Sequence, residues 1–302
     1  MKGFIKFIIG LVIFLVFSAI VLLVVGIILI NMTPNKLKVG DKTIINGKSC
    51  NDLGIGDVKI KTMISDFSDI KDKKNVVTNP INGEKANEEL DPIFEKFNLI
   101  KDDEYDFEKL YTTGLYGSQS YYYEYSDSTI CYILNNSISY FQGDAETITN
   151  FNFEISEVSF YGNKKEMRVV YKVDISEFKQ KLEKTIPSFV SRFIGMPKQV
   201  YLVSYYDVAV TEEGLLDLTY KNIYINDVDT EFSNAILRSI STENNELEQY
   251  GESLGDAISS AISFLGKIGT AEVNSNNEIV SGTASIGIDG YKNGKIGMIC
   301  GN

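Results

Sequence analysis

An uncharged run near the N-terminus, from Phe7 to Ile30, constrains this chain more than any other feature. Ser18 is the only polar side chain within it. At about 1.5 Å per residue a helix of this length spans about 36 Å, and the hydrocarbon core of a bilayer is about 30 Å thick. The run therefore predicts a transmembrane helix that crosses the bilayer with some tilt.

A cleaved signal peptide is the alternative interpretation of the same run. Such peptides have a shorter apolar region, of about 7–15 residues, followed by a small-residue cleavage site. The residues after the run, "ILINMTPNK", contain no A-x-A pattern, and no cysteine follows closely enough for a lipoprotein anchor. The sequence favours an uncleaved anchor.

Two features orient this anchor. Basic residues flank both ends, so their count alone does not place the N-terminus inside: Lys2 and Lys6 precede the run, and Lys36, Lys38, Lys42 and Lys48 follow it. The tail before the run is short and basic, however. Without its two lysines, 27 of the 29 basic residues remain against 41 acidic residues, so the rest of the chain is acidic. Anionic lipid on the cytoplasmic leaflet would repel an acidic domain. We expect a single-pass protein of the cell membrane with residues 31–302 extracytoplasmic.

Composition excludes several kinds of function. The net charge of −12 argues against nucleic acid as a partner, because phosphate binding needs a basic patch. The absence of His excludes a Ser-His-Asp triad, a Cys-His pair and His-ligated zinc. Three cysteines are too few for a disulfide scaffold. Cys131 is expected to be a buried thiol, whereas Cys50 and Cys300 lie in Gly-flanked segments and could pair.

The chain is expected to have four parts: a basic tail over 1–6, the transmembrane helix over 7–30, membrane-proximal strands and turns over 31–80, and an α+β domain over 81–302. Apolar spacing in this last part predicts a helix with Leu90 and Phe94, and another with Ile130 and Ile133 that is capped by Ser126 or Asp127. A hairpin turning at Gly162 and Asn163 follows.

The second strand of that hairpin alternates strictly. Its apolar side chains point to one face: Met167, Val169, Tyr171, Val173 and Ile175. Its polar side chains, Arg168, Lys172 and Asp174, point to the other face, which we expect to be solvated. Two more strands, within 199–210 and 215–226, bring Leu202 and Leu216 to the apolar face. The predicted fold class is α+β: an N-terminal transmembrane helix followed by a mainly antiparallel curved sheet packed on long amphipathic helices.

A long amphipathic helix is predicted between these strand pairs. Asp174 and Glu177 have the spacing of a capping box, and Pro187 marks a bend or break. The helix carries an apolar stripe at helical period: Phe178, Leu182, Ile186, Phe189, Val190 and Phe193. The stripe is either plain core or the lining of an apolar groove, and the energy of burying a Phe cannot distinguish the two.

The motifs that could carry chemistry are weak. Ser176 and Lys179 match the S-x-x-K spacing of serine acyltransferases, but no S-D-N or K-T-G follows, so the pair is better explained as a helix start. Asp227, Asp229 and Glu231 lack the glycine and the bidentate glutamate of a calcium loop, and a turn that caps the next helix is the simpler interpretation. We expect no catalysis, no metal and no cofactor.

The last long helix, predicted from about Glu246 to Gly269, carries a stripe of small residues, Gly251, Gly255, Ser259 and Ser263. Such a stripe lets another backbone approach closely. It fits tight packing on the sheet or contact with a helix of a partner protein.

The pattern "YSDSTICYILNN", then a hairpin ending in "YKVDISEF", an amphipathic helix, "VYLVSYYDVAV" and "GLLDLTYKNIYIN" resembles single-pass envelope proteins of Gram-positive bacteria. Their outer domains are similar to the tubular lipid-binding (TULIP-like) class, in which a curved sheet wraps a long helix around an apolar groove. The resemblance covers roughly residues 120–240 and includes no diagnostic motif. It implies a groove for lipid and identifies no ligand.

Two functions are consistent with the sequence. One is a non-enzymatic module that binds lipid in a groove lined by the stripe from Phe178 to Phe193. The other is a scaffold or protein-interaction domain at the outer membrane face. A contiguous apolar cavity would favour the first, and a filled core with exposed apolar residues would favour the second.

Overall fold

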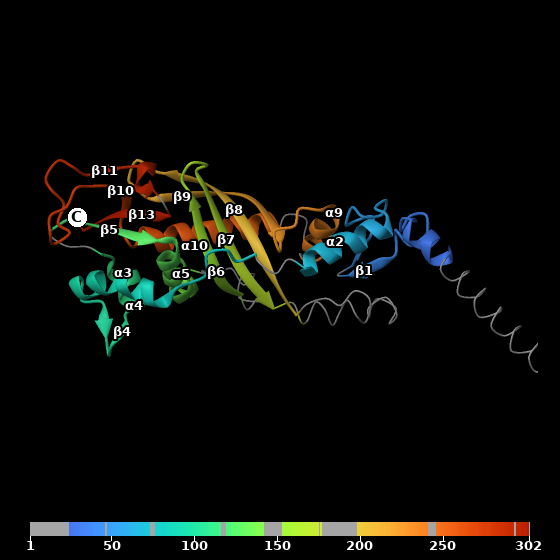
Figure 1. Cartoon of the computed structure of the whole chain (residues 1–302), viewed down its shortest axis with the longest axis horizontal. Helices are drawn as coiled ribbons and strands as arrows, with labels where there is room; N and C mark the ends of the chain where they lie inside the picture. The colour runs from blue at the N-terminus through green and yellow to red at the C-terminus, as the bar shows by residue number, and fades with distance from the viewer. Residues whose placement is uncertain are drawn as a thin grey trace, which may run out of the picture. The chain divides into compact units, whose positions relative to one another are not determined.

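A computed structural model describes residues 24–45, 47–72, 76–115, 119–141, 153–174, 176, 198–240, 246–292 and 294–301 (Figure 1). The chain forms two compact units. The first includes residues up to Asp72 together with 229–242. The second includes 73–176, 197–228 and 243–302. Each unit is described by itself.

The first unit is small and mostly helical. Residues 24–30 are helical, and a short ribbon follows, made of β1 (Thr43–Ile45) and β2 (Lys48–Ser49). Helices α2 (Ile60–Asp72) and α9 (Glu231–Ile240) pack through Phe67 and Phe232, whose ring centroids lie 6.3 Å apart. A small core surrounds Cys50. Helix α2 was not predicted, because only strands and turns were expected over 31–80.

The predicted transmembrane run lies largely outside the described residues, which begin at Val24. Within the part of the chain that the structure describes, no helix is both long enough and apolar enough to cross a membrane.

The second unit contains two larger antiparallel sheets. One is a four-stranded meander of β6 (Phe153–Tyr161), β7 (Glu166–Asp174), β8 (Gln199–Val210) and β9 (Leu216–Ile225). The other joins β5 (Tyr121–Ser126) to β10 (Lys267–Thr270), β11 (Ser285–Ile286), β12 (Tyr291–Lys292) and β13 (Lys295–Cys300). The α+β class with antiparallel sheets is therefore confirmed. The single predicted sheet is in fact two, because β13 pairs along all of β5 and not with the meander.

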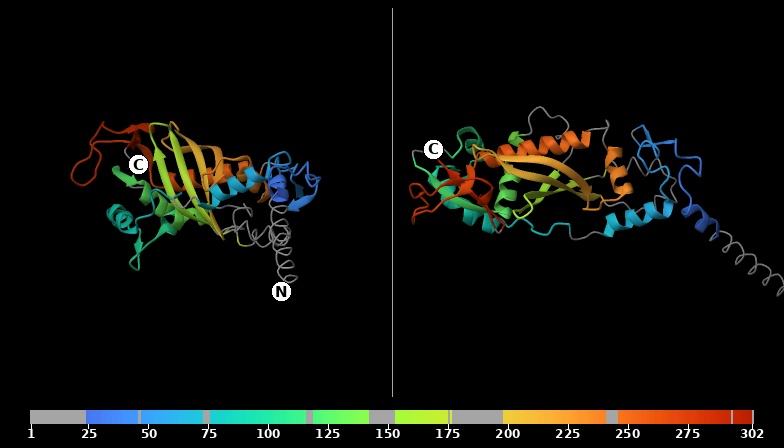
Figure 2. Two further views of the ribbon diagram at one scale, coloured as in Figure 1. Left: turned by 45° about the vertical axis from the view of Figure 1, so that its right-hand side comes forward. Right: turned by 90° about the horizontal axis from the view of Figure 1, so that it is seen from above.

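Helices cover this unit at several places. Helix α10 (Glu246–Ser263) packs on β9, and α5 (Asp127–Phe141) packs on β6 and on α10 (Figure 2). Helix α3 (Gly83–Lys96) contacts α5, as does α4 (Phe107–Thr113). The ribbon of β3 (Ile100–Lys101) and β4 (Glu104–Tyr105) and the 3-10 turn η1 (Ile288–Gly290) complete the unit.

Local signals explain where several elements begin. The Ser126 hydroxyl accepts from the Thr129 N–H at 3.3 Å, which confirms the predicted cap of α5. Asn82 caps α3 by accepting from the Lys85 N–H at 3.1 Å. The β6–β7 turn lies over residues 162–165, as predicted from Gly162 and Asn163.

The small-residue stripe of α10 is used within the chain. A Cβ on Gly251 would lie 2.2 Å from the Tyr220 ring, and one on Gly255 would lie 3.0 Å from Tyr206 Cε1. These contacts show that the two glycines let α10 sit directly on tyrosines of β8 and β9. Ser263 donates from its hydroxyl to the carbonyl of Ser259 within the same helix.

Candidate functional site

The predicted groove residues cannot be placed. Residues 177–197 lie outside the described part of the chain, and they include Phe178, Leu182, Ile186, Phe189, Val190 and Phe193. The groove therefore stays a prediction. The strand residues expected to face it are described: Val169, Tyr171, Val173 and Leu216 are buried, and Leu202 is half-buried.

Tyrosine side chains fill this apolar face of the meander. The hydroxyls of Tyr171 and Tyr206 lie 3.4 Å apart, and the Tyr206 hydroxyl also donates to the Gly251 carbonyl at 3.2 Å. Burial raises the pKa of Tyr206 to about 12, and raises that of Tyr171 well above its ordinary value, so both stay neutral. Among the described elements, helix α10 packs against this face at β9 and at Tyr206 of β8.

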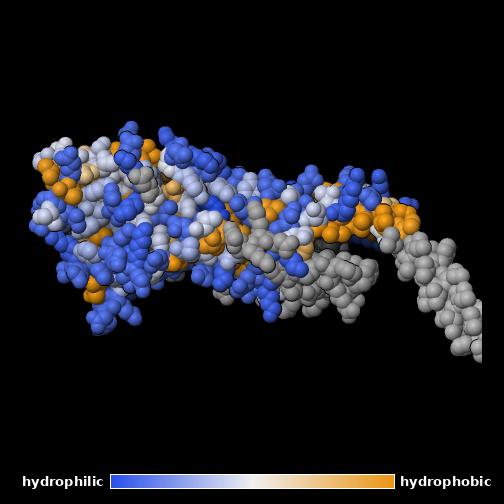
Figure 3. All heavy atoms as spheres, in the orientation of Figure 1, coloured by the Kyte–Doolittle hydropathy of each residue, from blue (hydrophilic) through white to orange (hydrophobic). Residues whose placement is uncertain are grey.

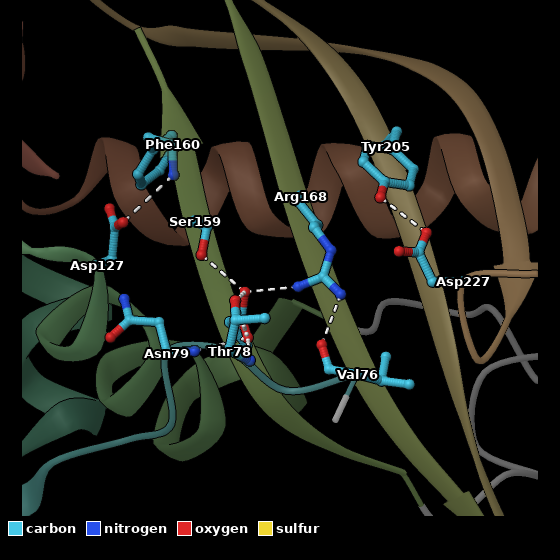
Figure 4. A network of polar contacts seen from close by, with 10 residues as sticks. Val76, Thr78, Asn79, Asp127, Ser159, Phe160, Arg168, Tyr205 and Asp227 are labelled. Atoms are coloured by element: carbon cyan, nitrogen blue, oxygen red, sulfur yellow. Dashed lines mark hydrogen bonds and ion pairs between the residues drawn. The ribbon is translucent and has the colours of Figure 1, made fainter. Parts of the chain in front are cut away.

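The opposite face carries an enclosed charge cluster, which we call the carboxylate clamp: Glu157, Arg168, Ser159 and the segment Val76–Asn79 (Figure 4). Arg168 donates to Glu157 across 2.6 Å, and its second terminal nitrogen donates to the Val76 carbonyl at 2.7 Å. Glu157 is fully buried, and Arg168 is 5% exposed.

Backbone and hydroxyl donors complete the clamp. The Glu157 carboxylate accepts from the Asn79 N–H at 2.9 Å, the Thr78 hydroxyl at 3.0 Å and the Ser159 hydroxyl at 2.8 Å. It also accepts from the Thr78 N–H. The Val76–Asn79 segment therefore crosses the sheet as a strap held by one carboxylate.

This arrangement corrects one prediction. Lys172 and Asp174 lie on a partly solvated face as expected, but Arg168 does not. The strap covers the sheet beside Arg168, where Val76 packs with Val170 and Val203. The burial of this face is imposed by a segment that lies far away in the sequence.

Both members of the clamp are held in their charged forms. Burial by itself would raise the pKa of Glu157, but the N–H groups of Asn79 and Thr78, the Ser159 hydroxyl and the Arg168 charge outweigh it, so the pKa lies below its ordinary value. Burial would lower the pKa of Arg168, and the Glu157 carboxylate more than offsets that effect. A carboxylate with so many donors has little capacity to act as a base.

A second acidic side chain, Asp127, has few hydrogen-bond partners. It lies at the start of α5, where one oxygen accepts from the Phe160 N–H at 3.4 Å and the other, Oδ1, is buried without a partner. Burial, and to a smaller extent the Glu157 charge, raises the pKa of Asp127 to about 7, although the Phe160 N–H and Lys85 act in the opposite direction.

The sequence missed the clamp, although one local signal was present. Apolar residues of β6 alternate through Phe153 and Ile155 but resume at Val158, so their phase changes. The register shows the cause: Ile155 pairs with Tyr171 and Glu157 pairs with Val170, which leaves Ser156 in a β-bulge. The bulge turns Glu157 to the face of Arg168.

The other predicted residues have structural partners. Ser176 donates from its N–H to the Asp174 carboxylate at 2.7 Å, which is the geometry of a helix start. Asp227 accepts from the Tyr205 hydroxyl at 2.8 Å. Thr230 accepts from the Ser233 N–H and caps α9. Among the described residues, no group of three or more His, Cys, Asp and Glu side chains could hold a metal ion.

All three cysteines are unpaired and buried. The sequence left open whether Cys50 and Cys300 pair, and both thiols are free in the structure. Cys50 belongs to the core of the first unit, and Cys300 donates to the Leu265 carbonyl at 2.9 Å in the second. Cys131 is buried on α5, as predicted.

Comparison with models of protein families, with curated proteins and with solved structures found no match.

Proposed function

We propose that this chain is a single-pass membrane protein whose extracytoplasmic α+β region holds a partner at the membrane face without catalysing a reaction. The helical residues 24–30 carry this proposal. Apart from Gly26 they are all large and aliphatic, and their exposure runs from 37% at Ile30 to 54% at Ile28 (Figure 3). A helix that is apolar on every side suits lipid, because a helix in water needs a polar face.

A non-enzymatic role is supported by the state of the buried charges. Glu157 and Arg168 are paired and further hydrogen-bonded, and the buried tyrosines are neutral. General acid–base catalysis needs a group within reach of substrate and with a pKa near the working pH. Asp127 has such a pKa but is 7% exposed, so it does not face a site that substrate could enter.

The choice of a protein partner over lipid rests on the packing of α10 against the sheet and on where apolar side chains are exposed. Val273, Val280 and Ile286 are between 38% and 45% exposed, and all lie between β10 and η1. Backbone hydrogen bonds fix this segment: the Tyr122 N–H donates to the Asn277 carbonyl, and the Ile279 N–H donates to that of Ser120. Exposed aliphatic side chains on an ordered segment suit a protein contact.

Lipid binding is the second candidate, and the amphipathic stripe from Phe178 to Phe193 favours it. Leu182→Trp and Val190→Trp distinguish the two. If the stripe is core, both changes overpack it and cost about 1–3 kcal/mol, and the purified wild-type chain carries no stoichiometric lipid. Stoichiometric lipid found by mass spectrometry in the wild type, and lost in both variants without a change in melting temperature, would favour the groove.

The topology can be tested with a thiol reagent that does not cross membranes. The native thiols are buried, so labelling should report introduced cysteines. Asn163→Cys, on the exposed β6–β7 turn, should react on intact cells. Lys2→Cys, in the predicted inner tail, should react only after lysis. The reverse pattern would contradict the proposed orientation, and labelling of both sites on intact cells would contradict a span.

The partner contact can be tested by photocrosslinking in intact cells. A photoreactive amino acid at Val280 should give a discrete adduct. The same amino acid at Asn163, which is also exposed but is polar and lies in a turn, serves as the control. Equal adducts at both positions would show that the exposed aliphatic segment has no special role.

A further inference from the structure

The segment after the apolar helix contains one short sequence pattern twice. Residues 35–41, "NKLKVGD", and 51–57, "NDLGIGD", share Asn, Leu, a β-branched aliphatic, Gly and Asp at matched positions. We call them the first and second turn. The backbone repeats as well: the Leu37 N–H donates to the Thr33 carbonyl, and the Leu53 N–H donates to the Ser49 carbonyl.

The two turns complete each other. The Asn35 N–H donates to the Gly56 carbonyl and the Asn51 N–H to the Gly40 carbonyl, both at 3.0 Å. The Asn35 amide donates to Asp57 at 3.1 Å, and the Asn51 amide donates to Asp41 at 2.7 Å. These reciprocal bonds give the pair an approximate two-fold symmetry, so each turn is an internal control for the other.

The matched positions differ sharply in charge. Lys36 and Lys38 of the first turn correspond to Asp52 and Gly54 of the second turn, and Lys42, directly after the first turn, corresponds to Val58, directly after the second. All three lysines are exposed, in a chain whose net charge is −12. Because the second turn adopts the same hydrogen bonding without lysine, the turn itself does not require these side chains.

Lys38 strengthens this point. Its φ is 56°, in the left-handed region, and its counterpart Gly54 has φ of 76°. Glycine adopts this conformation freely, whereas a residue with a Cβ is strained there. The first turn therefore carries a lysine where the second turn shows that glycine suits the backbone.

The first turn is also held close to the end of the apolar helix. The Met32 N–H donates to the Leu29 carbonyl, and the Met32 carbonyl accepts from the Ile60 N–H at the start of α2. Lys36 follows Ile30 by six positions, so the chain places it within about 20 Å of that residue even when extended. Lysine then extends its ammonium group on a flexible stem.

We propose that Lys36, Lys38 and Lys42 bind the phosphate groups of anionic phospholipids in the leaflet where the apolar helix ends. The inference rests on the proposed membrane anchor and adds its lipid class. An anionic membrane surface attracts a nearby lysine about fivefold, roughly 1 kcal/mol each. The same surface repels the acidic remainder of the chain, so the three lysines orient the first turn towards the lipid.

The repeated pattern supplies the test variant. Lys36→Asp, Lys38→Gly and Lys42→Val together give the first turn the residues of the second, which this backbone already accommodates. The control makes the same three changes on exposed lysines of the other unit: Lys101→Asp, Lys165→Gly and Lys198→Val. Lys165 also has a positive φ, of 50°, so its change to glycine matches that at Lys38.

The full chain is reconstituted into vesicles that contain spin-labelled phosphatidylglycerol or phosphatidylcholine. Electron paramagnetic resonance then measures the fraction of labelled lipid whose motion the protein restricts. The wild type and the control should prefer phosphatidylglycerol at least about fivefold at low salt, the effect expected of one lysine. The preference should disappear in the first-turn variant and fall at high salt, because screening weakens exposed charge pairs.

The outcomes separate this inference from the proposed function. Equal restriction of both lipids by a wild type that inserts stably would overturn the lysine site and leave the anchor standing. A chain that does not insert would overturn both. If soluble glycerol phosphate at the same phosphate concentration removed the preference, the lysines would recognise free phosphate, and the lipid assignment would be wrong.

Discussion

The side chains of Glu157 and Arg168 form a buried ion pair. Breaking such a pair by removing one partner leaves the other charge buried, which typically costs about 3–5 kcal/mol. We therefore expect Glu157→Gln to lower the free energy of unfolding by about this amount, measured by denaturant titration of the full chain. The strap from Val76 to Asn79 should lose its fixed position as well.

Glu154→Gln is a matched control for this change. Glu154 lies on the same strand and pairs with Lys172 across 3.7 Å, but both side chains are exposed, at 61% and 37%. Exposed pairs contribute about 0–1 kcal/mol. An equal effect of the two substitutions would contradict the view that the clamp holds the strap. Combining Glu157→Gln with Arg168→Met should recover part of the loss, since no unpaired charge then stays buried.

Asp127 should make stability depend on pH. Its pKa is about 7 in the folded chain and about 3.9 in an unfolded one, so the folded state binds this proton more tightly. Stability from this group is therefore fully present below about pH 4 and declines as pH rises to about 7. At about 1.4 kcal/mol per pH unit the decline is up to about 4 kcal/mol.

Asp127→Asn removes that titration. The difference in unfolding free energy between the variant and the wild type should move in favour of the variant between pH 5 and pH 8. Asp256→Asn, on the exposed side of α10, is the control and should follow the wild type at both pH values. A constant difference for Asp127→Asn across this range would mean that Asp127 finds a charge partner on ionisation.

At the scale of elements, the contact of α10 with β9 depends on the absence of a side chain at Gly251. Alanine is the better helix former by about 1 kcal/mol, so propensity alone predicts that Gly251→Ala stabilises the chain. Its Cβ would lie 2.2 Å from the Tyr220 ring, however, and overpacking of this kind costs about 1–3 kcal/mol. We expect a lower melting temperature.

Gly83→Ala tests the propensity term by itself. Gly83 begins α3, and nothing lies within 4 Å of the position of its Cβ. This substitution should be neutral or stabilising. If Gly251→Ala stabilised the chain to the same extent, α10 would not be held against Tyr220 in solution.

The elements that the sequence predicted are those with local signals. Helix α5 has its cap and its apolar spacing within a few residues, and the β6–β7 turn has Gly162 at its start. Helix α2 was missed although Met63, Phe67 and Ile70 have helical spacing, because the turn residues around it directed the interpretation towards strands.

The clamp could not be predicted in the same way. Thr78 and Glu157 are 79 positions apart, and nothing in either segment indicates that one covers the other. The bulge at Ser156 was the available clue, and it shows only that Glu157 changes face. Tertiary packing decides which group pairs with a buried charge, and the periodicity of the sequence carries no information about that packing.

At the scale of the whole molecule, the two units are interleaved along the chain. The first unit includes residues up to Asp72, yet it also needs 229–242. Arg238 donates to the Leu53 carbonyl at 2.8 Å, and the Arg238 carbonyl accepts from Lys48 at 2.7 Å, across 185 and 190 positions. Deletion of 229–242 should therefore expose the Cys50 thiol to reagent while Cys131 stays protected.

That interleaving has a consequence during synthesis. A ribosome adds about 5–20 residues per second, so roughly 10–40 s separate the appearance of Leu53 from that of Arg238. Throughout this interval the part of the chain that emerges first lacks the helix that covers its core around Cys50 and Ile55. The portion that follows the apolar helix is thus among the first to be made and among the last to close, and chaperones or proteases meet it while it is open.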